Sequence, residues 1–220
     1  MPEAARTATG KAIVNLLELQ PDEKVAALMR IRAFADDRCI LFATERGTVK
    51  QTLLSHYRNI RRNGLIAINI DEGDHLIQVC QTRIDDHVIL ATAHGQTIRF
   101  GVEQVRTTGR NSTGVRGIAL EEGDRVVSMT VVSPEAALMI ATSNGYGKRT
   151  AFGEFRVQHR GGKGIIGIQT SSRNGEVVAA AAVREDEALM MMTANGMIVR
   201  SPVDQLRVIG RNTQGVRLVN

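Results

Sequence analysis

The sequence repeats itself with a period close to fifty residues. Four segments share a glycine between two apolar runs, and the intervals between successive glycines are 48, 50 and 51 residues. A second set of glycines keeps the same period, with intervals of 50, 50 and 51 residues. Two independent landmarks that stay in register indicate a repeat architecture. The first set is Gly47, Gly95, Gly145 and Gly196, and the second is Gly64, Gly114, Gly164 and Gly215.

Each repeat is predicted to form four short β-strands. In the second repeat the apolar runs cover residues 64–70, 75–82, 87–93 and 96–102, and they are separated by the turns DEGD, RIDD and HG. Glycine in a two-residue turn between apolar runs is typical of β-hairpins, because it supplies the positive φ that such turns need. No repeat shows sustained helical periodicity, which argues against a helical solenoid.

A four-stranded unit of this size cannot bury both of its faces alone, so repeated units must pack against each other. The sequence therefore predicts an all-β, propeller-like array of about four to five blades in a single domain over residues 1–220. Residues 1–20, which include a divergent copy of the second glycine segment at Gly10, resemble the end of one unit and the start of the next. The predicted repeats are 10–62, 63–112, 113–162 and 163–213, with 214–220 starting or closing another.

Composition favours a cytosolic protein with an acidic partner. Lys and Arg number 28 against 23 Asp and Glu, which gives a formal net charge of +5 and a pI of about 9.7. Aromatic residues make up only 3%, which disfavours single-stranded nucleic acid stacked on aromatic side chains and favours a duplex. Cys39 and Cys80 lie in apolar runs and are predicted to be buried reduced thiols. We expect a soluble protein, since no signal peptide or membrane span is evident.

Positive charge recurs at fixed positions of the repeat. One set follows the turn glycine, and another lies in the loop before the next repeat. Acidic residues concentrate in the turns DEGD, EEGD and REDE. Because a merely solubilising surface has no reason to sort charge by repeat phase, the pattern predicts a basic rim that binds phosphates. The predicted rim residues are Lys50, Arg61, Arg62, Arg99, Arg110, Arg116, Lys148, Arg149, Arg200, Arg211 and Arg217, with further loop cations at Arg58, Arg106, Arg156, Arg160, Lys163 and Arg207.

A rim with blade-by-blade cations could follow the backbone of a bent duplex. Bending 20–30 base pairs by 40–90° costs on the order of 1–6 kcal/mol, so wrapping needs many distributed phosphate contacts. The sequence shows no recognition helix, zinc-finger spacing or aromatic RNA-binding strand. We therefore expect DNA binding that is independent of base sequence.

The loop QHRGGKG, residues 158–164, combines cations with three glycines. Glycine lets the backbone approach a phosphate closely, while Arg160 and Lys163 supply charge. This stretch closely resembles the basic box of the gyrase A C-terminal domain family, which belongs to the type IIA topoisomerases. The segments ATSNGYGKRT, GRNSTGVRGI and GRNTQGV match as well, and the similarity extends from Pro2 to Asn220. His159 departs from the family's usual second basic residue, and the box falls in the fourth of five loop copies rather than in the first blade.

The resemblance implies a β-pinwheel, a propeller-like disc whose blades exchange strands and whose edge wraps duplex DNA. It marks residues 158–164 as DNA-binding: Gln158, His159, Arg160, Gly161, Gly162, Lys163 and Gly164. It also implies a fragment of a bacterial cytoplasmic, nucleoid-associated protein that supports ATP-driven negative supercoiling together with gyrase B and the rest of gyrase A. Catalysis, ATP and Mg²⁺ belong to other parts of that enzyme. We therefore expect no cofactor, no membrane and no catalytic residue here, and neither Tyr57 nor Tyr146 stands in the family's catalytic context.

Several alternatives compete with this interpretation. The related C-terminal domain of topoisomerase IV is the nearest, although its box is usually degraded. A propeller used for protein interaction would favour apolar or mixed rims. Residues 109–114 have the glycine spacing of a P-loop, but Val115 stands where that motif needs lysine. The five histidines show no metal-binding spacing, and the methionines at 190–192 are predicted to pack in a core strand.

Overall fold

The computed structural model describes residues 19, 23–59 and 64–219. These residues form β-strands and short 3₁₀ helices. The 3₁₀ helices are η2 (Leu54–Tyr57), η3 (Val102–Gln104), η4 (Phe152–Glu154) and η5 (Val203–Gln205). The strands are β1 (Cys39–Thr44), β2 (Thr48–Leu53), β3 (Leu76–Thr82), β4 (His87–Thr92), β5 (Gln96–Gly101), β6 (Val115–Arg116), β7 (Val126–Val131), β8 (Ala137–Thr142), β9 (Tyr146–Ala151), β10 (Ile165–Ile166), β11 (Val177–Val183), β12 (Ala188–Met192), β13 (Ile198–Pro202) and β14 (Val216–Arg217).

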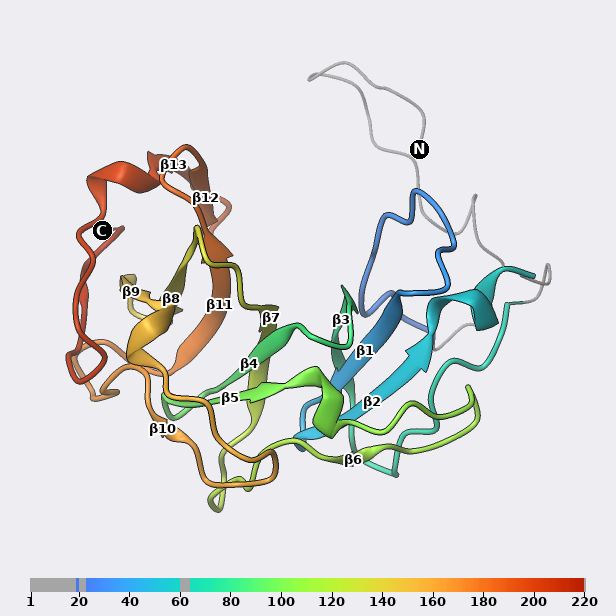
Figure 1. Ribbon diagram of the computed structural model, residues 1–220. Helices are drawn as coiled ribbons and strands as arrows, with labels where there is room; N and C mark the ends of the chain where they lie inside the picture. Colours follow the sequence, from blue (N-terminus) through green and yellow to red (C-terminus); the bar gives the residue numbers. More distant parts are fainter. Residues whose placement is uncertain (1–18, 20–22, 60–63, 220) are drawn as a thin grey trace.

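Each complete sheet combines strands from three successive repeats. The sheets have the orders β3-β1-β2-β6, β10-β5-β4-β7 and β11-β8-β9-β14, and all named pairs are antiparallel. The central hairpin of every sheet turns at a glycine with φ between 75° and 87°. Figure 1 shows the sheets side by side along an open arc, with the β12–β13 hairpin at one end. The all-β, strand-exchanging fold is confirmed, and the predicted repeat limits describe sequence units rather than single sheets.

The strand predicted over residues 64–70 does not form. This segment is the repeat equivalent of β6, β10 and β14, and each of those pairs with the second strand of a hairpin from an earlier repeat. The described residues contain no hairpin that precedes β1–β2, so residues 64–70 have no partner strand. The same holds for residues 25–31, which correspond to β3, β7 and β11. The divergent copy at Gly10 lies outside the described residues.

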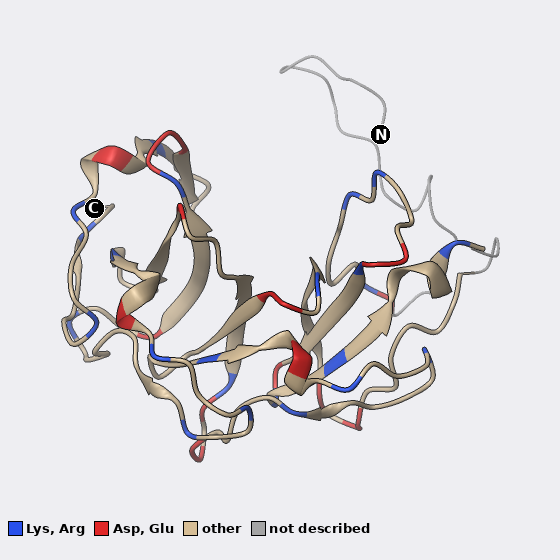
Figure 2. Cartoon of the chain, viewed as in Figure 1, with Lys and Arg blue, Asp and Glu red and all other residues tan. Residues whose placement is uncertain are grey.

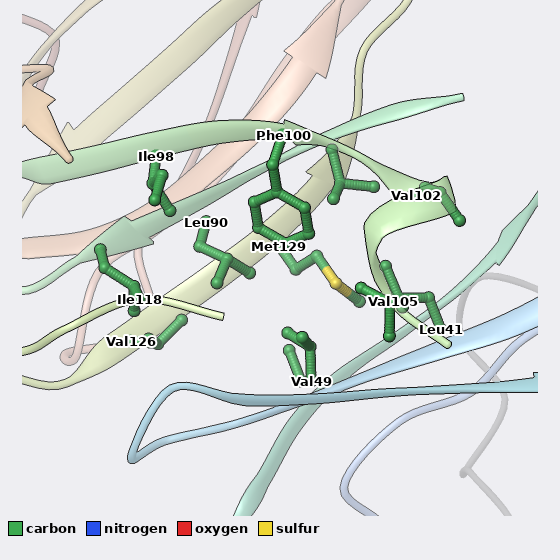
Figure 3. Packing of buried hydrophobic residues seen from close by; sticks show 12 residues of the cluster. Leu41, Val49, Leu90, Ile98, Phe100, Val102, Val105, Ile118, Val126 and Met129 are labelled. Carbon is green, nitrogen blue, oxygen red and sulfur yellow. The ribbon is translucent and has the colours of Figure 1, made fainter. Parts of the chain in front are cut away.

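Hydrophobic cores lie between successive sheets. Figure 3 shows the core between the first and second sheets, in which Leu41 and Val49 pack with Leu90, Phe100 and Met129. A second core between the second and third sheets includes Ile89, Leu138 and Phe155, among others. Because side chains alternate across a strand, each hairpin contributes to two cores. Packing between neighbours therefore holds the array together, as expected of a repeat protein.

The two cysteines and the methionine run have different environments. Cys39 is buried, as predicted, whereas Cys80, which was also predicted to be buried, is half-buried; both are free thiols. The prediction for the methionines is wrong at two positions, because Met190 is 70% exposed and Met192 is 69% exposed. Both belong to β12, whose sheet has two strands among the described residues. Within that part of the chain, no further sheet covers this face.

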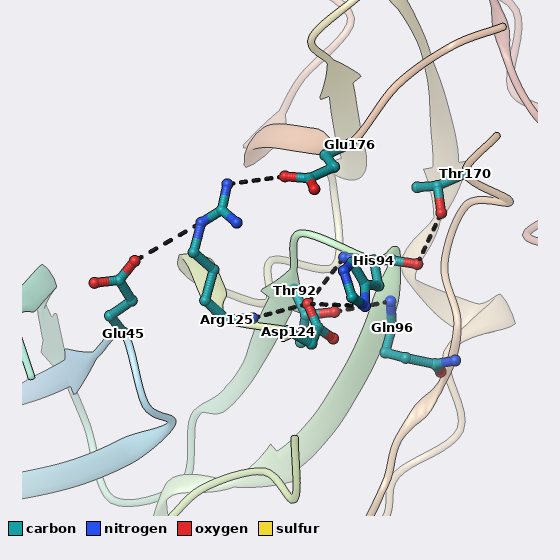
Figure 4. A network of polar contacts seen from close by, with 8 residues as sticks. All are labelled: Glu45, Thr92, His94, Gln96, Asp124, Arg125, Thr170 and Glu176. Atoms are coloured by element: carbon teal, nitrogen blue, oxygen red, sulfur yellow. Dashed lines mark hydrogen bonds and ion pairs between the residues drawn. The ribbon is translucent and has the colours of Figure 1, made fainter. Parts of the chain in front are cut away.

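Ion pairs join the turns of three repeats at one end of the sheets. Arg125 lies 2.9 Å from a carboxylate oxygen of Glu176 and 3.7 Å from one of Glu45, as Figure 4 shows. In the same region the Asp124 carboxylate accepts hydrogen bonds from the backbone amides of His94 and Arg125. The positive charge of Arg125 is therefore balanced by acidic neighbours.

Candidate nucleic-acid interface

Three loops form a continuous edge, which we term the loop belt: residues 106–118, 156–168 and 207–219. Each loop runs beside the second strand of a hairpin, with parallel bridges between Gln51 and Thr107, Arg99 and Val157, and Arg149 and Val208. Gly161 of the second loop donates a backbone hydrogen bond to Gly117 of the first at 2.7 Å, and Gln169, directly after the second loop, donates to Thr213 of the third at 2.9 Å. The repeat thus places equivalent loops side by side along one rim.

The structure contradicts the prediction that Lys50 and Lys148 line an exposed rim. Both side chains are only 1% exposed. The Lys50 ammonium group donates hydrogen bonds to the carbonyls of Ala67 and Arg110, and Lys148 donates to those of Gly210 and Arg211 and to the Thr213 hydroxyl. The two lysines hold belt loops onto the sheets, because buried ammonium groups require such partners.

Burial also changes the acidity of these two groups. Desolvation lowers the pKa of Lys50 to about 8, and the nearby Arg110 guanidinium contributes in the same direction. Desolvation and the charge of Arg211 lower the pKa of Lys148 to about 8 as well. Their ordinary pKa is 10.5.

Two arginines that follow the turn glycine are also structural. Arg149 is 5% exposed, donates to the carbonyl of Leu206, and lies 3.3 Å from the Glu185 carboxylate. Arg99 is half-buried and donates to the carbonyl of Phe152 at 3.0 Å. Their guanidinium groups are therefore directed at the protein, which contradicts their assignment to an exposed rim. Arg200 on β13 is exposed, and Arg61 and Arg62 lie outside the described residues.

Equivalent arginines in two loops connect the loop belt along its length. Arg160 donates to the carbonyl of Arg116 at 3.0 Å and to that of Gln104 at 2.8 Å. Arg211 donates to the carbonyl of Ile166 at 2.8 Å. Both side chains are half-buried, as is their repeat equivalent Arg110. These arginines fix the spacing between loops while leaving positive charge at the rim.

The remaining loop cations are exposed. Arg116 and Lys163 have no carboxylate within ion-pair distance among the described residues, and neither side chain donates a hydrogen bond there. Arg217, at the repeat position of Arg116, lies over the ring of Tyr146 at 5.3 Å. Figure 2 shows Lys and Arg along the loops at the lower and left edges of the view. Exposed cations of this group are Arg106, Arg116, Arg156, Lys163, Arg207 and Arg217.

The loop at 158–164 rests on a different support from its equivalents. Its neighbours at 109–114 and 210–215 lie over the buried lysines, whereas Ile98 takes the lysine position in the second hairpin. The Ile98 side chain lies 3.7 Å from where a Cβ at Gly162 would stand. Lys163 on the loop is exposed, and no backbone partner for the Gly162 and Lys163 amides occurs among the described residues. These adjacent amides and the ammonium group could together bind a phosphate.

Two glycines of this loop differ in what a side chain would meet. Gly164 has φ of +80°, and a Cβ there would lie 2.5 Å from the backbone oxygen of Thr97. We expect Gly164→Ala to reduce the free energy of unfolding by about 1–3 kcal/mol, because φ is in the left-handed region and the carbonyl belongs to a paired strand. For Gly162→Ala, whose Cβ would have no neighbour closer than 3.5 Å, we expect about 0.5 kcal/mol or less. Thermal unfolding of the two variants measures the difference, and equal losses would contradict it.

The predicted set omitted Arg173, which lies with its guanidinium 5.1 Å from the centre of the Tyr146 ring. Hydrogen bonding from Arg173, followed by that from Arg217, lowers the pKa of Tyr146. A sequence signal was present, since the fourth repeat has SSRNGE where the second and third have the acidic turns DEGD and EEGD. Among the described residues there is no cluster of three metal-binding side chains, and no helix long and apolar enough to span a membrane.

Strand-exchanged sheets with a basic loop edge define the chain as a β-pinwheel of the propeller-like class. A family model described as the DNA gyrase C-terminal domain, beta-propeller, matches residues 2–32, 40–79, 86–133, 136–184 and 187–220. The chain belongs to this family of DNA gyrase C-terminal domains, so the resemblance found in the sequence is confirmed.

Curated relatives and solved structures agree with the family. The DNA gyrase A protein of Halalkalibacterium halodurans is 55% identical over 219 residues, and that of Escherichia coli K12 is 45% identical over 219 residues. These matches cover 100% of the chain but 26% and 25% of the relatives, so the chain spans about a quarter of their length. A gyrase A C-terminal domain structure matches with a TM-score of 0.87 at 25% identity, over 97% of this chain and 72% of that one. A topoisomerase IV C-terminal domain matches with a TM-score of 0.88 at 25% identity, over 96% and 66%.

Proposed function

We propose that this domain binds duplex DNA along the loop belt, without regard to base sequence, and curves the DNA around the rim. The cations of the belt repeat from loop to loop along the arc of sheets. Successive phosphates of a bent duplex would meet Arg116, Lys163 and Arg217 in turn. Each phosphate neutralised releases counterions, which offsets the elastic cost of bending.

The alignment of exposed cations on equivalent, adjoining loops is the observation that carries this proposal. Away from the belt, some exposed cations have acidic partners, since Arg125 pairs with Glu45 and Glu176 and Arg184 lies 2.9 Å from Glu187. Others, such as Arg46 and Arg200, have no ion pair among the described residues, but they do not lie on equivalent loops of successive repeats. On the belt, Arg116 and Lys163 have no such partner among the described residues. Unpaired cations along one edge favour an anionic ligand that runs along the same edge.

The domain would serve as the non-catalytic, DNA-wrapping part of a gyrase A protein. In this proposal gyrase B and the rest of gyrase A supply strand cleavage, ATP and Mg²⁺ in the bacterial cytoplasm, where the enzyme works on chromosomal DNA. The wrapped segment would be presented for strand passage with a fixed crossing sign and would thereby favour negative supercoils. The curated relatives are DNA gyrase A proteins, which supports this assignment.

A linking-number measurement tests the proposal directly. A nicked plasmid is saturated with the chain, resealed with ligase, freed of protein and compared with plasmid resealed alone. We expect a shift in the mean linking number that grows with bound protein, because wrapped DNA stores writhe. Binding without any shift would contradict wrapping and leave only rim binding.

A further inference from the structure

The turn before β11 differs in charge and in length from the equivalent turns before β3 and β7. Those turns are DEGD and EEGD, whereas β11 follows SSRNGE at residues 171–176. The segment from the loop glycine to the strand is one residue longer here, covering 164–177 against 64–76 and 114–126. This end of the third sheet therefore carries a cation, Arg173, where the charged residues of the equivalent turns are all acidic.

A buried asparagine holds this turn in place beside the loop belt. Asn174 is 0% exposed, and its side-chain amide donates hydrogen bonds to the carbonyls of Gln169 at 2.8 Å and Gln214 at 3.1 Å. Asn144, in the turn of the β8–β9 hairpin, donates to the carbonyl of Arg173 at 3.2 Å. Because Gln214 belongs to the loop belt, these bonds fix the backbone of Arg173 relative to the belt.

The side chain of Arg173 meets an arginine of the loop belt at a tyrosine ring. Its guanidinium lies 5.1 Å from the centre of the Tyr146 ring, and its Nε donates to the Tyr146 hydroxyl at 3.5 Å. Arg217 lies over the same ring at 5.3 Å. The residues that pair with the loop belt at the equivalent point of the first two hairpins, Thr48 and Gln96, offer no ring. Since aromatic faces attract guanidinium groups, Tyr146 brings together one cation of the belt and one outside it.

The charge of Arg173 is not balanced by an acid. The side chain is exposed, and no carboxylate lies within ion-pair distance of it in the described part of the chain. Glu176, the acid of the same turn, pairs instead with Arg125 at 2.9 Å, as Figure 4 shows. Two guanidinium groups at one ring repel each other, and an anion close to both would relieve this repulsion. Phosphate oxygens suit the site, because they accept hydrogen bonds from guanidinium groups.

We infer that Arg173 binds a phosphate of the duplex outside the loop belt, beside the phosphate that Arg217 binds. At the first two sheets, the acidic turns at residues 71–74 and 121–124 repel the duplex and keep it on the loops. At the third sheet the turn attracts it, so the duplex extends from the belt across the turn end of that sheet. The inference rests on the proposed function and deepens it, since it gives the DNA path a direction at one sheet.

Arginine modification by phenylglyoxal, read by mass spectrometry, tests the contact on the full chain without a variant. The rate at each arginine is compared with and without a mixed-sequence duplex long enough to follow all three loops. With free duplex at about ten times its Kd, modification of Arg173 should slow by about tenfold, because mass action leaves roughly a tenth of the protein unbound. Arg46 is the matched control, since it is exposed at the turn end of the first sheet, next to an acidic turn. Its rate should not change.

The outcome at Arg217 separates this inference from the proposed function. Protection of Arg217 without protection of Arg173 would overturn the inference and leave binding along the loop belt in place. If neither arginine were protected by bound duplex, both the inference and the proposed path of the DNA would be wrong.

Variants at the same positions provide a second readout. We expect Arg173→Gln to reduce the slope of log affinity against log salt by about 0.9, the contribution of one phosphate contact. Arg173→Lys should restore the slope because it keeps the charge, and Arg46→Gln should leave the slope at the parental value. A parental slope in Arg173→Gln, together with a reduced slope in Lys163→Gln, would overturn the inference alone. A parental slope in both would count against the proposed function as well.

Discussion

Replacing Lys148 with Met will detach residues 207–218 from the third sheet and lower the melting temperature by roughly 6–12 °C. The variant leaves the carbonyls of Gly210 and Arg211 without the ammonium donor that they have in the native structure. We expect a loss of about 3 kcal/mol, because buried polar groups without partners cost about 1–3 kcal/mol each. In a chain of this length, 1 kcal/mol corresponds to roughly 2–4 °C. Thermal unfolding measures the overall loss, and hydrogen exchange localises it to residues 207–218.

Lys163→Met is the matched control for this change. It removes the same side chain from an exposed site in an equivalent loop, so the melting temperature should change little. If both variants melt like the parent, or both lose stability equally, the proposed role of the buried lysine is wrong.

The pH dependence of stability separates the ammonium group from simple loss of packing. The pKa of Lys148 is about 8 in the folded chain, below its ordinary value of 10.5. Between these values the unfolded chain binds more protons than the folded one, so the free energy of unfolding rises with pH from about 8 to 10.5. In Lys148→Met the free energy of unfolding should rise less between these pH values, because the titrating group is gone. A variant that keeps Lys148 and loses only packing nearby should show the full rise.

The repeat and the all-β class could be predicted from sequence, because turn glycines and apolar runs are local signals, whereas strand exchange was implied only by the family resemblance. The partners of each strand could not be. Residues 64–70 have the pattern of a strand, yet they remain unpaired because the hairpin they would join is absent from the described residues. The exposure of Met190 has the same origin. In a repeat array, a segment's structure depends on neighbours about fifty or a hundred residues away.

The position of the candidate site on the interblade loops could be predicted from sequence, but several of the residues assigned to it were wrong. Charge that recurs with the repeat located the loop belt, but Lys50 and Lys148 recur just as regularly and are buried. Periodicity marks every position with a repeated role, structural or functional. A second signal was present in the sequence, at the third residue after the turn glycine. Lysine stands there in the hairpins that support the loops GRNSTG and GRNTQG, whereas Ile98 stands there in the hairpin that supports HRGGKG. That correlation distinguishes lysines that hold loops from Lys163, which extends from one.

The exposed belt cations should account for most of the salt dependence of DNA binding. We expect Arg116→Gln, Lys163→Gln and Arg217→Gln together to reduce the slope of log affinity against log salt by about 3. Each phosphate contact contributes a slope of about 0.9, and all three side chains are exposed on the loop belt. Fluorescence anisotropy with a labelled duplex, titrated at several salt concentrations, measures the slope. With the same triple variant, the linking number of the resealed plasmid should no longer shift.

A charge-matched variant distinguishes rim contacts from general attraction. Lys24→Gln, Arg83→Gln and Arg184→Gln remove the same three positive charges from exposed sites off the belt, where Arg83 and Arg184 already face carboxylates. If net charge alone drew DNA to the protein, both variants would lose affinity equally. Because counterions are released only where a phosphate meets a cation, the slope of this second variant should stay close to that of the parent. Equal losses would mean that DNA does not follow the loop belt.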